Sequence, residues 1–300
     1  MDAQNKVPIL LDTDIGSDID DAVCLSYLLR QSRCELLGIT TVSGEPEKRA
    51  MLADAICRVE GRPDIPIHAG TGDPLWGKQK QPQAQQGVVL DNWDHRRDFQ
   101  SNTAVDFLRK TIRSRPHEIT LLTIGPLTNM ALLFRMDPEI PKLLKGMVMM
   151  IGAFTHPLEF VRIPVEWNSY LDPWAAAIVY DSIKEIPNFS IGLDVTEKCT
   201  MEAEECRKRL KGGALDLVME AAEVWFEYSD KITFHDPLAG AAIFNHELIS
   251  YDDGLVQVET TSPILTGMTI WDTKPEEAVH KVGTKVDSEG FFQEFFSVVQ

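Results

Sequence analysis

The sequence feature that most constrains the fold is a repeated alternation between short apolar segments and longer amphipathic ones. Val7–Leu11 is continuously apolar and predicts a buried strand, and Ala22–Leu29 predicts the helix that follows it. The same alternation predicts further strands and helices, in chain order, at Glu35–Val42, Glu47–Val59, Ile65–His68, Thr103–Ile112, Ile119–Ile124, Leu127–Phe134, Met147–Ile151, Asp172–Tyr180 and Phe189–Val195. Strands that are apolar on both faces are typical of a parallel sheet covered by helices on each side. We therefore predict an α/β fold with an open, mostly parallel sheet and helices on both faces.

The last third of the chain is less regular and adds a helical region to this core. Helices are predicted at Met201–Leu210, Leu215–Tyr228 and His235–Phe244, and a late strand at Val256–Thr260. Earlier in the chain, the polar, glutamine-rich segment Gly77–Gly87 is typical of an exposed loop or lid. No segment has the composition of a linker between independent units, so we predict a single domain over residues 1–300.

The net charge of the chain bears on which classes of partner it can bind. The 46 acidic residues outnumber the 29 basic ones and give a formal net charge of −17. This charge disfavours a nucleic-acid partner, because phosphate contacts need clustered Lys and Arg side chains. It suits a cation-binding site, although solubility alone also accounts for it.

Cysteine usage and hydropathy bear on the compartment. The five cysteines are odd in number and form no C-x-x-C pair, so we expect neither a disulfide framework nor a zinc ribbon. A reducing compartment fits this pattern better. Met1–Pro8 lacks the basic start and apolar run of a signal peptide, and no stretch approaches the length of a membrane span. We expect a cytoplasmic protein without a membrane partner.

The chemistry of the chain is concentrated between Asp12 and Asp21, a segment that reads Asp-Thr-Asp-Ile-Gly-Ser-Asp-Ile-Asp-Asp. Its five carboxylates lie directly after a predicted buried strand and before a predicted helix. In an open α/β sheet this is the carboxyl edge of a strand, where ligands bind. The carboxylates repel one another unless a cation joins them. Because the segment holds neither His nor Cys, its oxygen ligands favour Ca²⁺ or Mg²⁺ over zinc.

Three other interpretations of this segment fit less well. The acids nearest the helix suit capping of its N-terminus, but the two acids at the strand end stay unexplained. An EF-hand loop starting at Asp12 would need Gly at its sixth position and Glu at its twelfth, which are Ser17 and Val23. A phosphatase of the haloacid-dehalogenase type would use Asp12 as the nucleophile and Asp14 as the general acid, and would form an aspartyl phosphate. That alternative leaves the Asp-Asp pair without a role.

Beyond this segment the chain resembles a known family. The pattern D-x-D-x-G, followed by an Asp-Asp pair and an apolar helix, is similar to the signature of nucleoside hydrolases of the inosine/uridine-preferring type. Further segments resemble that family in order, at Gly38–Gly44, Leu122–Asn129, Glu166–Asn168 with Asp172-Pro173, Gly192–Thr196, His235–Pro237 and Leu265–Thr269. The resemblance implies a Rossmann-like core and hydrolysis of the N-glycosidic bond of ribonucleosides to free base and ribose.

The resemblance also implies a cofactor. Ca²⁺ would bind the ribose diol and the attacking water, held by Asp14, Asp21, the backbone carbonyl of Ile124, and Asp236. With one bidentate carboxylate, two sugar hydroxyls and a water, the cation would have about eight oxygen ligands, within the range of calcium. Asp14 would also act as the general base that takes a proton from the water.

The remaining implied roles concern the sugar and the base. Asp20, Glu166 and Asn168 would hydrogen-bond the ribose hydroxyls. Asp12 would orient the residues that contact the metal and the sugar, without contacting either itself. His235 would protonate the leaving base. Considered alone, His235 also suits a structural histidine at a helix N-terminus, and Glu166 and Asn168 also suit an ordinary loop before a helix. The resemblance favours the functional roles.

The chain departs from the family pattern at several positions. Its first motif is two residues longer than the common form, so Asp18 is an alternative to Asp20 or Asp21 as a metal ligand. Glu45 stands where an Asn is often found, and Gln81–Gln86 occupies the region that often carries a histidine on the base side. The residues implied for the metal and the ribose therefore match the family pattern, whereas those on the base side differ from it. The leaving group is left open between purine, pyrimidine and a non-standard base.

Three further expectations follow. Trp225, Phe226 and Tyr228 form an aromatic cluster that either stacks on the base or fills the core. The resemblance suggests a homo-oligomer, a dimer or tetramer, whose other partner is a small-molecule ribonucleoside. An alternative of another kind is a non-catalytic homologue that binds Ca²⁺ and ribose, in which the altered base side has abolished turnover.

Overall fold

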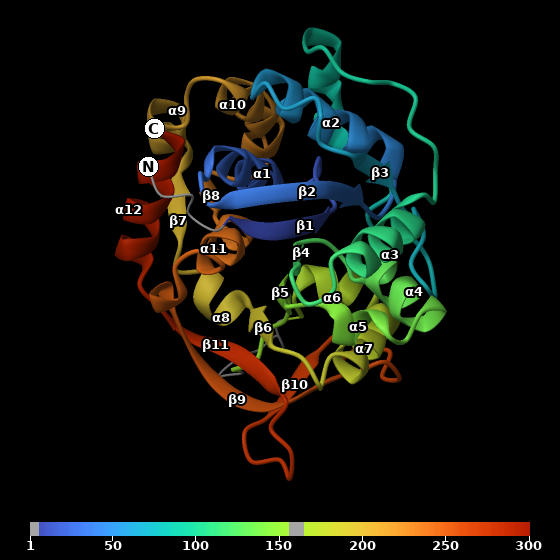
Figure 1. Ribbon diagram of the computed structural model, residues 1–300. Coiled ribbons are helices and arrows are strands. Elements are labelled where there is room, and N and C mark those ends of the chain that lie inside the picture. The colour runs from blue at the N-terminus through green and yellow to red at the C-terminus, as the bar shows by residue number, and fades with distance from the viewer. Residues whose placement is uncertain (1–5, 156–164) are drawn as a thin grey trace.

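The computed structural model describes residues 6–155 and 165–300, and its centre is a nine-stranded sheet (Figure 1). In spatial order the strands are β10 (Thr269–Asp272), β9 (Ile249–Val258), β11 (His280–Val286), β6 (Asn188–Ile191), β5 (Gly146–Met150), β4 (Thr120–Thr123), β1 (Val7–Thr13), β2 (Cys34–Thr41) and β3 (Ile67–Ala69). Every pairing from β11 to β3 is parallel, whereas β9 runs antiparallel to both β11 and β10. The predicted open, mostly parallel sheet is confirmed.

Helices cover both faces of the sheet, and the alternation along β1 shows how. Ile9 and Leu11 belong to one apolar core, whereas Leu10 between them belongs to the other. The first core packs against α1 (Asp20–Arg30), α2 (Pro46–Val59), α10 (Ala214–Phe226), α11 (His235–Ala242) and α12 (Ser288–Val299). The second packs against α3 (Ala104–Ser114), α4 (Thr128–Met136) and α7 (Pro173–Ser182) (Figure 1). Burial on both sides explains why these strands are apolar throughout.

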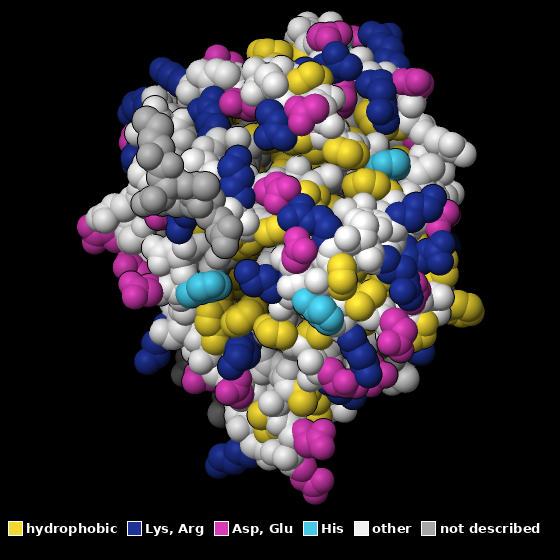
Figure 2. All heavy atoms as spheres, in the orientation of Figure 1, with side chains coloured by type: hydrophobic (Ala, Val, Ile, Leu, Met, Phe, Trp, Pro, Cys, Tyr) yellow, Lys and Arg dark blue, Asp and Glu magenta, His cyan; other side chains and the backbone are white. Residues whose placement is uncertain are grey.

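Shorter elements complete the described chain. They are the 3-10 helices η1 (Gln85–Asn92) and η2 (His246–Leu248), the helices α5 (Ile140–Leu143), α6 (Trp167–Leu171), α8 (Leu193–Thr196) and α9 (Ala203–Arg209), and an antiparallel pair of strands, β7 (Thr200–Glu202) and β8 (Lys231–Thr233). Among the residues that the structure describes, no helix is long and apolar enough to cross a bilayer. On the face shown in Figure 2, basic and acidic side chains are interspersed.

The strand predicted at Phe189–Val195 is wrong at its carboxyl end. β6 ends at Ile191, and Leu193–Thr196 forms the short helix α8. The turn between them is tight, because a Cβ on Gly192 would lie 2.5 Å from the carbonyl oxygen of Gly152. The first turn of α8 continues the apolar pattern of the strand, so the sequence does not reveal the change.

The three helices predicted in the last third of the chain are present, as α9, α10 and α11, but the region also contains the helix α12 and strands that were not predicted. The predicted strand Val256–Thr260 lies mostly within β9, but β10 and β11 were not expected, and β7 replaces the start of the predicted helix Met201–Leu210. In β9 the acidic Asp252 and Asp253 are exposed. Strands near a sheet edge that expose one face carry few apolar residues, so their sequence signal is weak.

Candidate active site

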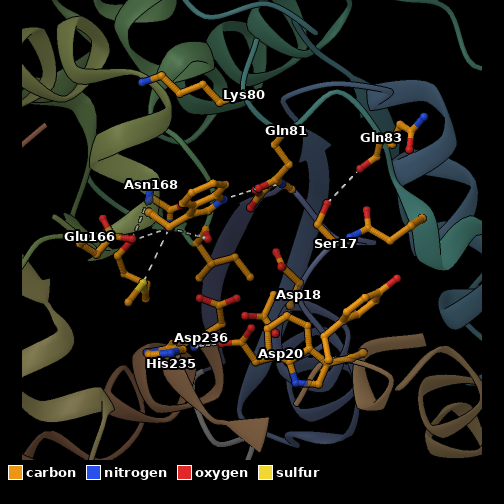
Figure 3. Close-up of a pocket in the computed structure, with 18 of the residues that line it drawn as sticks. Ser17, Asp18, Asp20, Lys80, Gln81, Gln83, Glu166, Asn168, His235 and Asp236 are labelled. Carbon is orange, nitrogen blue, oxygen red and sulfur yellow. Dashed lines mark hydrogen bonds between the residues drawn. The ribbon is translucent and has the colours of Figure 1, made fainter. Parts of the chain in front are cut away.

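The described residues enclose a cavity of about 710 Å³ at the carboxyl ends of the central parallel strands (Figure 3). Asp14 follows β1, Ile124 follows β4, and Met150 ends β5, and all three line the cavity. Other walls come from segments distant in sequence: the loop before η1, the start of α6, the end of α10 and the start of α11. The cavity therefore lies where open α/β sheets bind their ligands.

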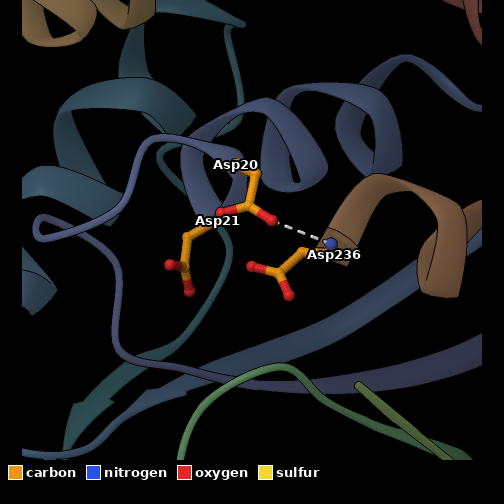
Figure 4. A group of neighbouring side chains, drawn as sticks. All are labelled: Asp20, Asp21 and Asp236. Carbon is orange, nitrogen blue, oxygen red and sulfur yellow. Dashed lines mark hydrogen bonds between the residues drawn. The ribbon is translucent and has the colours of Figure 1, made fainter. Parts of the chain in front are cut away.

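Three carboxylates meet at one side of this cavity. The carboxylate oxygens of Asp20, Asp21 and Asp236 lie within 4.8 Å of one another, and all three residues are buried (Figure 4). Asp20 and Asp21 are the first two residues of α1, and Asp236 is the second residue of α11. The backbone N–H of Asp236 donates to Asp20 Oδ2 (3.0 Å), and the hydroxyl of Thr13 donates to Asp21. The two helix starts thus hold acids from distant parts of the chain against one another.

The electrostatics of this group favour a cation. Burial and then the neighbouring carboxylates raise the pKa of Asp20, Asp21 and Asp236 well above the ordinary value of an aspartate. Within the described ranges, no Lys or Arg forms an ion pair with any of the three. Buried carboxylates without a basic partner either take up protons or bind a positive charge. The all-oxygen donor set fits a hard divalent cation such as Ca²⁺ or Mg²⁺.

Asp14, the predicted general base, lines the same cavity with a different set of neighbours. Its Oδ2 accepts a hydrogen bond from Gln81 Nε2 (2.7 Å). On its other side, a Cβ on Gly125 would lie 2.8 Å from Asp14 Oδ1, so only a glycine fits there. Burial raises the pKa of Asp14, and the positive charge of Arg49 opposes that rise. Membership of Asp14 and the Ile124 carbonyl in a metal site stays a prediction.

Two of the three predicted sugar-binding residues, Glu166 and Asn168, line the same cavity as the acids, at the start of α6. Glu166 caps α6: its Oε1 accepts from the backbone N–H of Asn168 (2.6 Å), and its Oε2 accepts from those of Ser169 (2.9 Å) and Gly152 (3.0 Å). Burial nevertheless raises the pKa of Glu166 to about 7. Asn168 Nδ2 donates to the carbonyl oxygen of Ile124 (3.0 Å). The structure thus brings this pair to the cavity, and their contact with ribose stays a prediction.

His235 also lines the cavity, one residue before Asp236. Its Nδ1 lies 2.7 Å from Thr196 Oγ1, which fixes the orientation of the ring. Burial lowers the pKa of His235 to about 4, so the imidazole is neutral near pH 7. In this state His235 can donate a hydrogen bond through one ring nitrogen but carries no surplus proton. Its predicted role as the acid for the leaving base is untested by these contacts.

Asp12 and Asp18 occupy very different positions. Asp12 is fully buried and does not line the cavity, and its Oδ1 accepts hydrogen bonds from Thr40 and from Asn129 Nδ2 (2.8 Å). Burial raises its pKa to about 7. A residue so enclosed cannot attack a phosphate, so the phosphatase alternative loses its nucleophile. Asp18 lines the cavity but does not belong to the group of three carboxylates, and burial raises its pKa to about 6.

Arg49 does not line the cavity but holds the main chain of the acidic motif from behind its wall, and the sequence did not reveal this role. Its side chain is fully buried in the first turn of α2, yet it has no carboxylate partner among the described residues. Its guanidinium donates to the carbonyl oxygens of Ser43 (2.7 Å), Ile15 (3.1 Å) and Asp14, and to Ser17 Oγ (3.0 Å). An arginine among other charged residues at a helix start normally indicates a solvated side chain, so no sequence signal marked it.

The glutamine-rich segment Gly77–Gly87, predicted to be an exposed loop or lid, is only partly exposed: six of its eleven residues are exposed, but Gln81, Ala84 and Gln86 are buried. Gln86 is buried, its backbone N–H donates to the carbonyl of Gly16 (3.0 Å), and its side chain donates to the carbonyl of Ser17 (3.1 Å). Gly16 has a φ of +111°, and a Cβ there would lie 2.6 Å from Leu52 Cδ1. The segment therefore packs directly on the acidic motif, and its middle part lines the cavity. Glutamines with these partners cannot be distinguished in sequence from solvated ones.

The aromatic residues near the end of α10 were predicted either to stack on the base or to fill the core, and they differ in their positions. Trp225 and Tyr228 line the cavity, and Tyr228 is 81% exposed. Trp225 also packs against the core and donates its indole N–H to the carbonyl of Lys231 (2.9 Å). Phe226 packs against the core with the guanidinium of Arg207 4.6 Å from its ring centre. Tyr228 is thus the member most open to a ligand.

The fold and this cavity define the class of the protein: an α/β protein with an acidic small-molecule site at the carboxyl ends of its parallel strands. The model of the inosine-uridine preferring nucleoside hydrolase family matches residues 9–293. The chain therefore belongs to this family. The predicted enzyme class, a hydrolase acting on N-glycosyl compounds, and the predicted hydrolysis of ribonucleosides are confirmed.

Individual relatives agree with this assignment. The chain is 31% identical to a pyrimidine-specific ribonucleoside hydrolase, RihA, of Salmonella gallinarum, over 95% of this chain and 96% of the relative. It is 29% identical to uridine nucleosidase 1 of Arabidopsis thaliana, over 88% and 81%. Among solved structures, a purine-preferring ribonucleoside hydrolase from Gardnerella vaginalis superposes with a TM-score of 0.83 at 26% identity, over 97% of this chain and 98% of that one. A plant nucleoside hydrolase reaches a TM-score of 0.85 at 23% identity, over 98% of each chain, and supports the fold.

Proposed function

We propose that the chain hydrolyses ribonucleosides in this cavity with Ca²⁺ as its cofactor. The observation that carries the proposal is the meeting of Asp20, Asp21 and Asp236, buried and without an ion-pair partner in the described chain, in the cavity that Glu166 and Asn168 also line. An all-oxygen group of this kind suits calcium. When bound, the cation would polarise the attacking water and fix the ribose diol.

The ligands proposed for the cation are Asp14, Asp21, Asp236 and the carbonyl of Ile124. The Ile124 carbonyl accepts one hydrogen bond from Asn168 and keeps a second lone pair, because a carbonyl oxygen has two. Asp20 Oδ2 is already occupied by the backbone N–H of Asp236, which supports a sugar-facing role for its other oxygen.

In the proposed reaction, Asp14 takes a proton from the attacking water, whose hydroxyl adds to C1′ of the ribose. The C1′–N bond breaks, and its electron pair leaves with the base through an oxocarbenium-like transition state. One proton is then added to the base nitrogen, so that a single water is divided between ribose and base. Burial raises the pKa of Asp14, which makes its carboxylate a stronger base than a solvated aspartate.

The proposed sugar and base contacts use the remaining residues of the cavity. Asn168 Oδ1 accepts no hydrogen bond from the described part of the chain, so it can accept one from a ribose hydroxyl. Asp20 and Glu166 would accept the others. His235 would face the base as a neutral imidazole and donate one hydrogen bond to it. The curated relatives are named for uridine and pyrimidine ribonucleosides and the Gardnerella protein for purines, so both classes are candidate substrates.

The test is release of reducing sugar from a panel of purine and pyrimidine ribonucleosides, with calcium and after chelation. We expect release that depends on calcium and falls by about 10³-fold or more in Asp14→Ala, because both a ligand and the general base are lost. Asp91→Ala, an exposed acid outside the cavity, is the matched control. Calcium binding without release from any nucleoside would instead favour the non-catalytic binder and would refute the proposal.

We further propose that the chain forms a homodimer or homotetramer and works in the cytoplasm. The support is the family resemblance for the oligomer, and the odd number of cysteines without a C-x-x-C pair for the compartment. Light scattering coupled to gel filtration measures the first, and fractionation of the cells that make the protein measures the second. A monomer, or a secreted protein, would overturn the respective proposal.

A further inference from the structure

Gln81 projects from the glutamine-rich segment into the cavity with both ends of its amide engaged by protein (Figure 3). Its Nε2 donates to Asp14 Oδ2 (2.7 Å), and its Oε1 accepts from the indole N–H of Trp167. A carboxylate only accepts hydrogen bonds and an indole N–H only donates, so the two partners allow one orientation of the amide. Gln81 is also 9% exposed, so solvent competes little for these bonds.

The backbone that carries Gln81 is itself held in place. Its N–H donates to Gln79 Oε1 (2.7 Å), and Gln79 Nε2 donates in turn to the carbonyl of Gly72. Gly44, at a φ of +59°, packs so closely that a Cβ there would lie 2.3 Å from the carbonyl oxygen of Gln81. The side chain therefore starts from a fixed main chain and ends on two fixed partners.

The second partner, Trp167, connects this contact to the other wall of the cavity. Trp167 begins α6 between Glu166 and Asn168, the residues proposed to bind the ribose. Lys80 repeats the connection one residue earlier, because its ammonium donates to the carbonyl of Tyr170 in the same helix and lies 3.6 Å from the ring centre of that tyrosine. The segment around Gln81 thus contacts both Asp14 and the helix α6, which carries the proposed ribose-binding residues.

We propose that Gln81 is a positioning residue for the reaction: it holds the carboxylate of Asp14 in its working orientation, and Trp167 holds Gln81. A glutamine in a substrate cavity would ordinarily be assigned to recognition of the substrate. Here the amide oxygen and one of the two amide N–H groups are already engaged by the protein, so its first effect is on Asp14. The inference rests on the proposed function, which gives Asp14 its role as base.

Two substitutions separate this role from a general effect on the fold. Gln81→Leu keeps a side chain of similar size and removes the donor to Asp14. Trp167→Phe keeps an aromatic ring and removes only the indole N–H. Gln100→Leu and Trp76→Phe are the matched controls, because both residues are exposed and neither lines the cavity.

We expect Gln81→Leu to lower kcat by about tenfold or more while KM changes by less than about threefold, because a misplaced base affects the chemical step more than binding. Trp167→Phe should lower kcat by a smaller factor, and this factor should vanish when Gln81 is already Leu. The double-mutant cycle tests that Trp167 acts through Gln81. Multiplicative effects of the two substitutions, or a Gln81→Leu enzyme with the wild-type kcat, would overturn the inference.

Crystal structures of the wild type and Gln81→Leu give a readout that is independent of turnover. We expect the Asp14 carboxylate to rotate, or to occupy more than one orientation, in the variant. An unchanged Asp14 would contradict the inference even if activity fell. If the wild type releases ribose from no nucleoside, the proposed function fails, and the orientation of Asp14 still decides the inference about Gln81. Should Gln81→Leu not fold, Trp167→Phe supplies the same comparison through a milder change.

Discussion

Arg49 permits a stability prediction that follows directly from its contacts. Replacing Arg49 with Met keeps much of the buried volume but removes the donor to the carbonyls of Asp14, Ile15 and Ser43. A buried acceptor left without a donor costs about 1–3 kcal/mol. Met also removes the cost of burying the guanidinium, which offsets part of this loss. We therefore expect Arg49→Met to lower the free energy of unfolding by about 3 kcal/mol.

The assay is urea unfolding in the presence of a chelator, with Arg49→Lys and Arg58→Met as comparisons. Lys keeps the positive charge but cannot spread hydrogen bonds over several carbonyls, so it should recover only part of the loss. Arg58 lies in the same helix and pairs with Asp54, which is buried but keeps the backbone N–H of Arg96 as a donor, so replacing Arg58 should cost less stability than replacing Arg49.

Calorimetric titration with calcium separates the charge of Arg49 from its hydrogen bonds. Burial lowers the pKa of Arg49, and the nearby carboxylates of Asp14 and then Asp21 raise it. If only this charge mattered, its removal would make the acids bind calcium more tightly. We expect weaker binding in Arg49→Met, because the loop that carries Asp14 loses its support. Tighter calcium binding, or a loss of stability below about 1 kcal/mol, would refute this reasoning.

Two further predictions concern pH and backbone geometry. Burial raises the pKa of Asp12 and Glu166 to about 7 and those of Asp20, Asp21 and Asp236 above their ordinary value, so their protonated forms favour the folded state. Without calcium, thermal melts should therefore show a Tm that falls as pH rises from about 5 to 8. Calcium should raise the Tm most at pH 8, where its proposed ligands are deprotonated. An increase in Tm with calcium that is the same at every pH would contradict this expectation. Gly16→Ala should lower the free energy of unfolding in urea by at least about 2 kcal/mol, because φ is +111° and the added Cβ meets Leu52. Gly61→Ala, where φ is +70° and the space is open, should lower it by about 1 kcal/mol. Equal losses in the two variants would refute the steric argument.

The central sheet could be predicted from the sequence because burial on both faces leaves a continuous apolar run, as in Val7–Leu11. The strands β10 and β11 and the first part of β9 could not, since one exposed face allows polar residues such as Asp252 and Asp253. The end of β6 was missed for the opposite reason. Leu193 and Val195 in the following helix α8 continue an alternating pattern that also fits a strand, and the turn depends on a tertiary contact of Gly192 with Gly152.

Some residues of the candidate site could likewise be predicted from the sequence, and others could not. The acids of the first motif stood out because several carboxylates in one short segment need an explanation, and the structure brings Asp20 and Asp21 to Asp236 across the sequence. Arg49 and Gln81 gave no such signal, because one charged residue in a helix and one glutamine in a polar loop are ordinary surface features. Their partners are backbone carbonyls and a carboxylate distant in sequence. A single sequence does not encode such contacts in any local pattern.

These missed residues share a physical task. Buried acids repel one another, so a chain that gathers them must hold them in place before a cation arrives. Thr13 donates to Asp21, Asn129 to Asp12, Gln81 to Asp14, and Arg49 to the main chain of Asp14. Each donor restrains one acidic residue without supplying a carboxylate of its own. If the acids bind calcium, these donors lower the cost of ordering the ligands, so their loss should weaken metal binding although none of them is a proposed ligand.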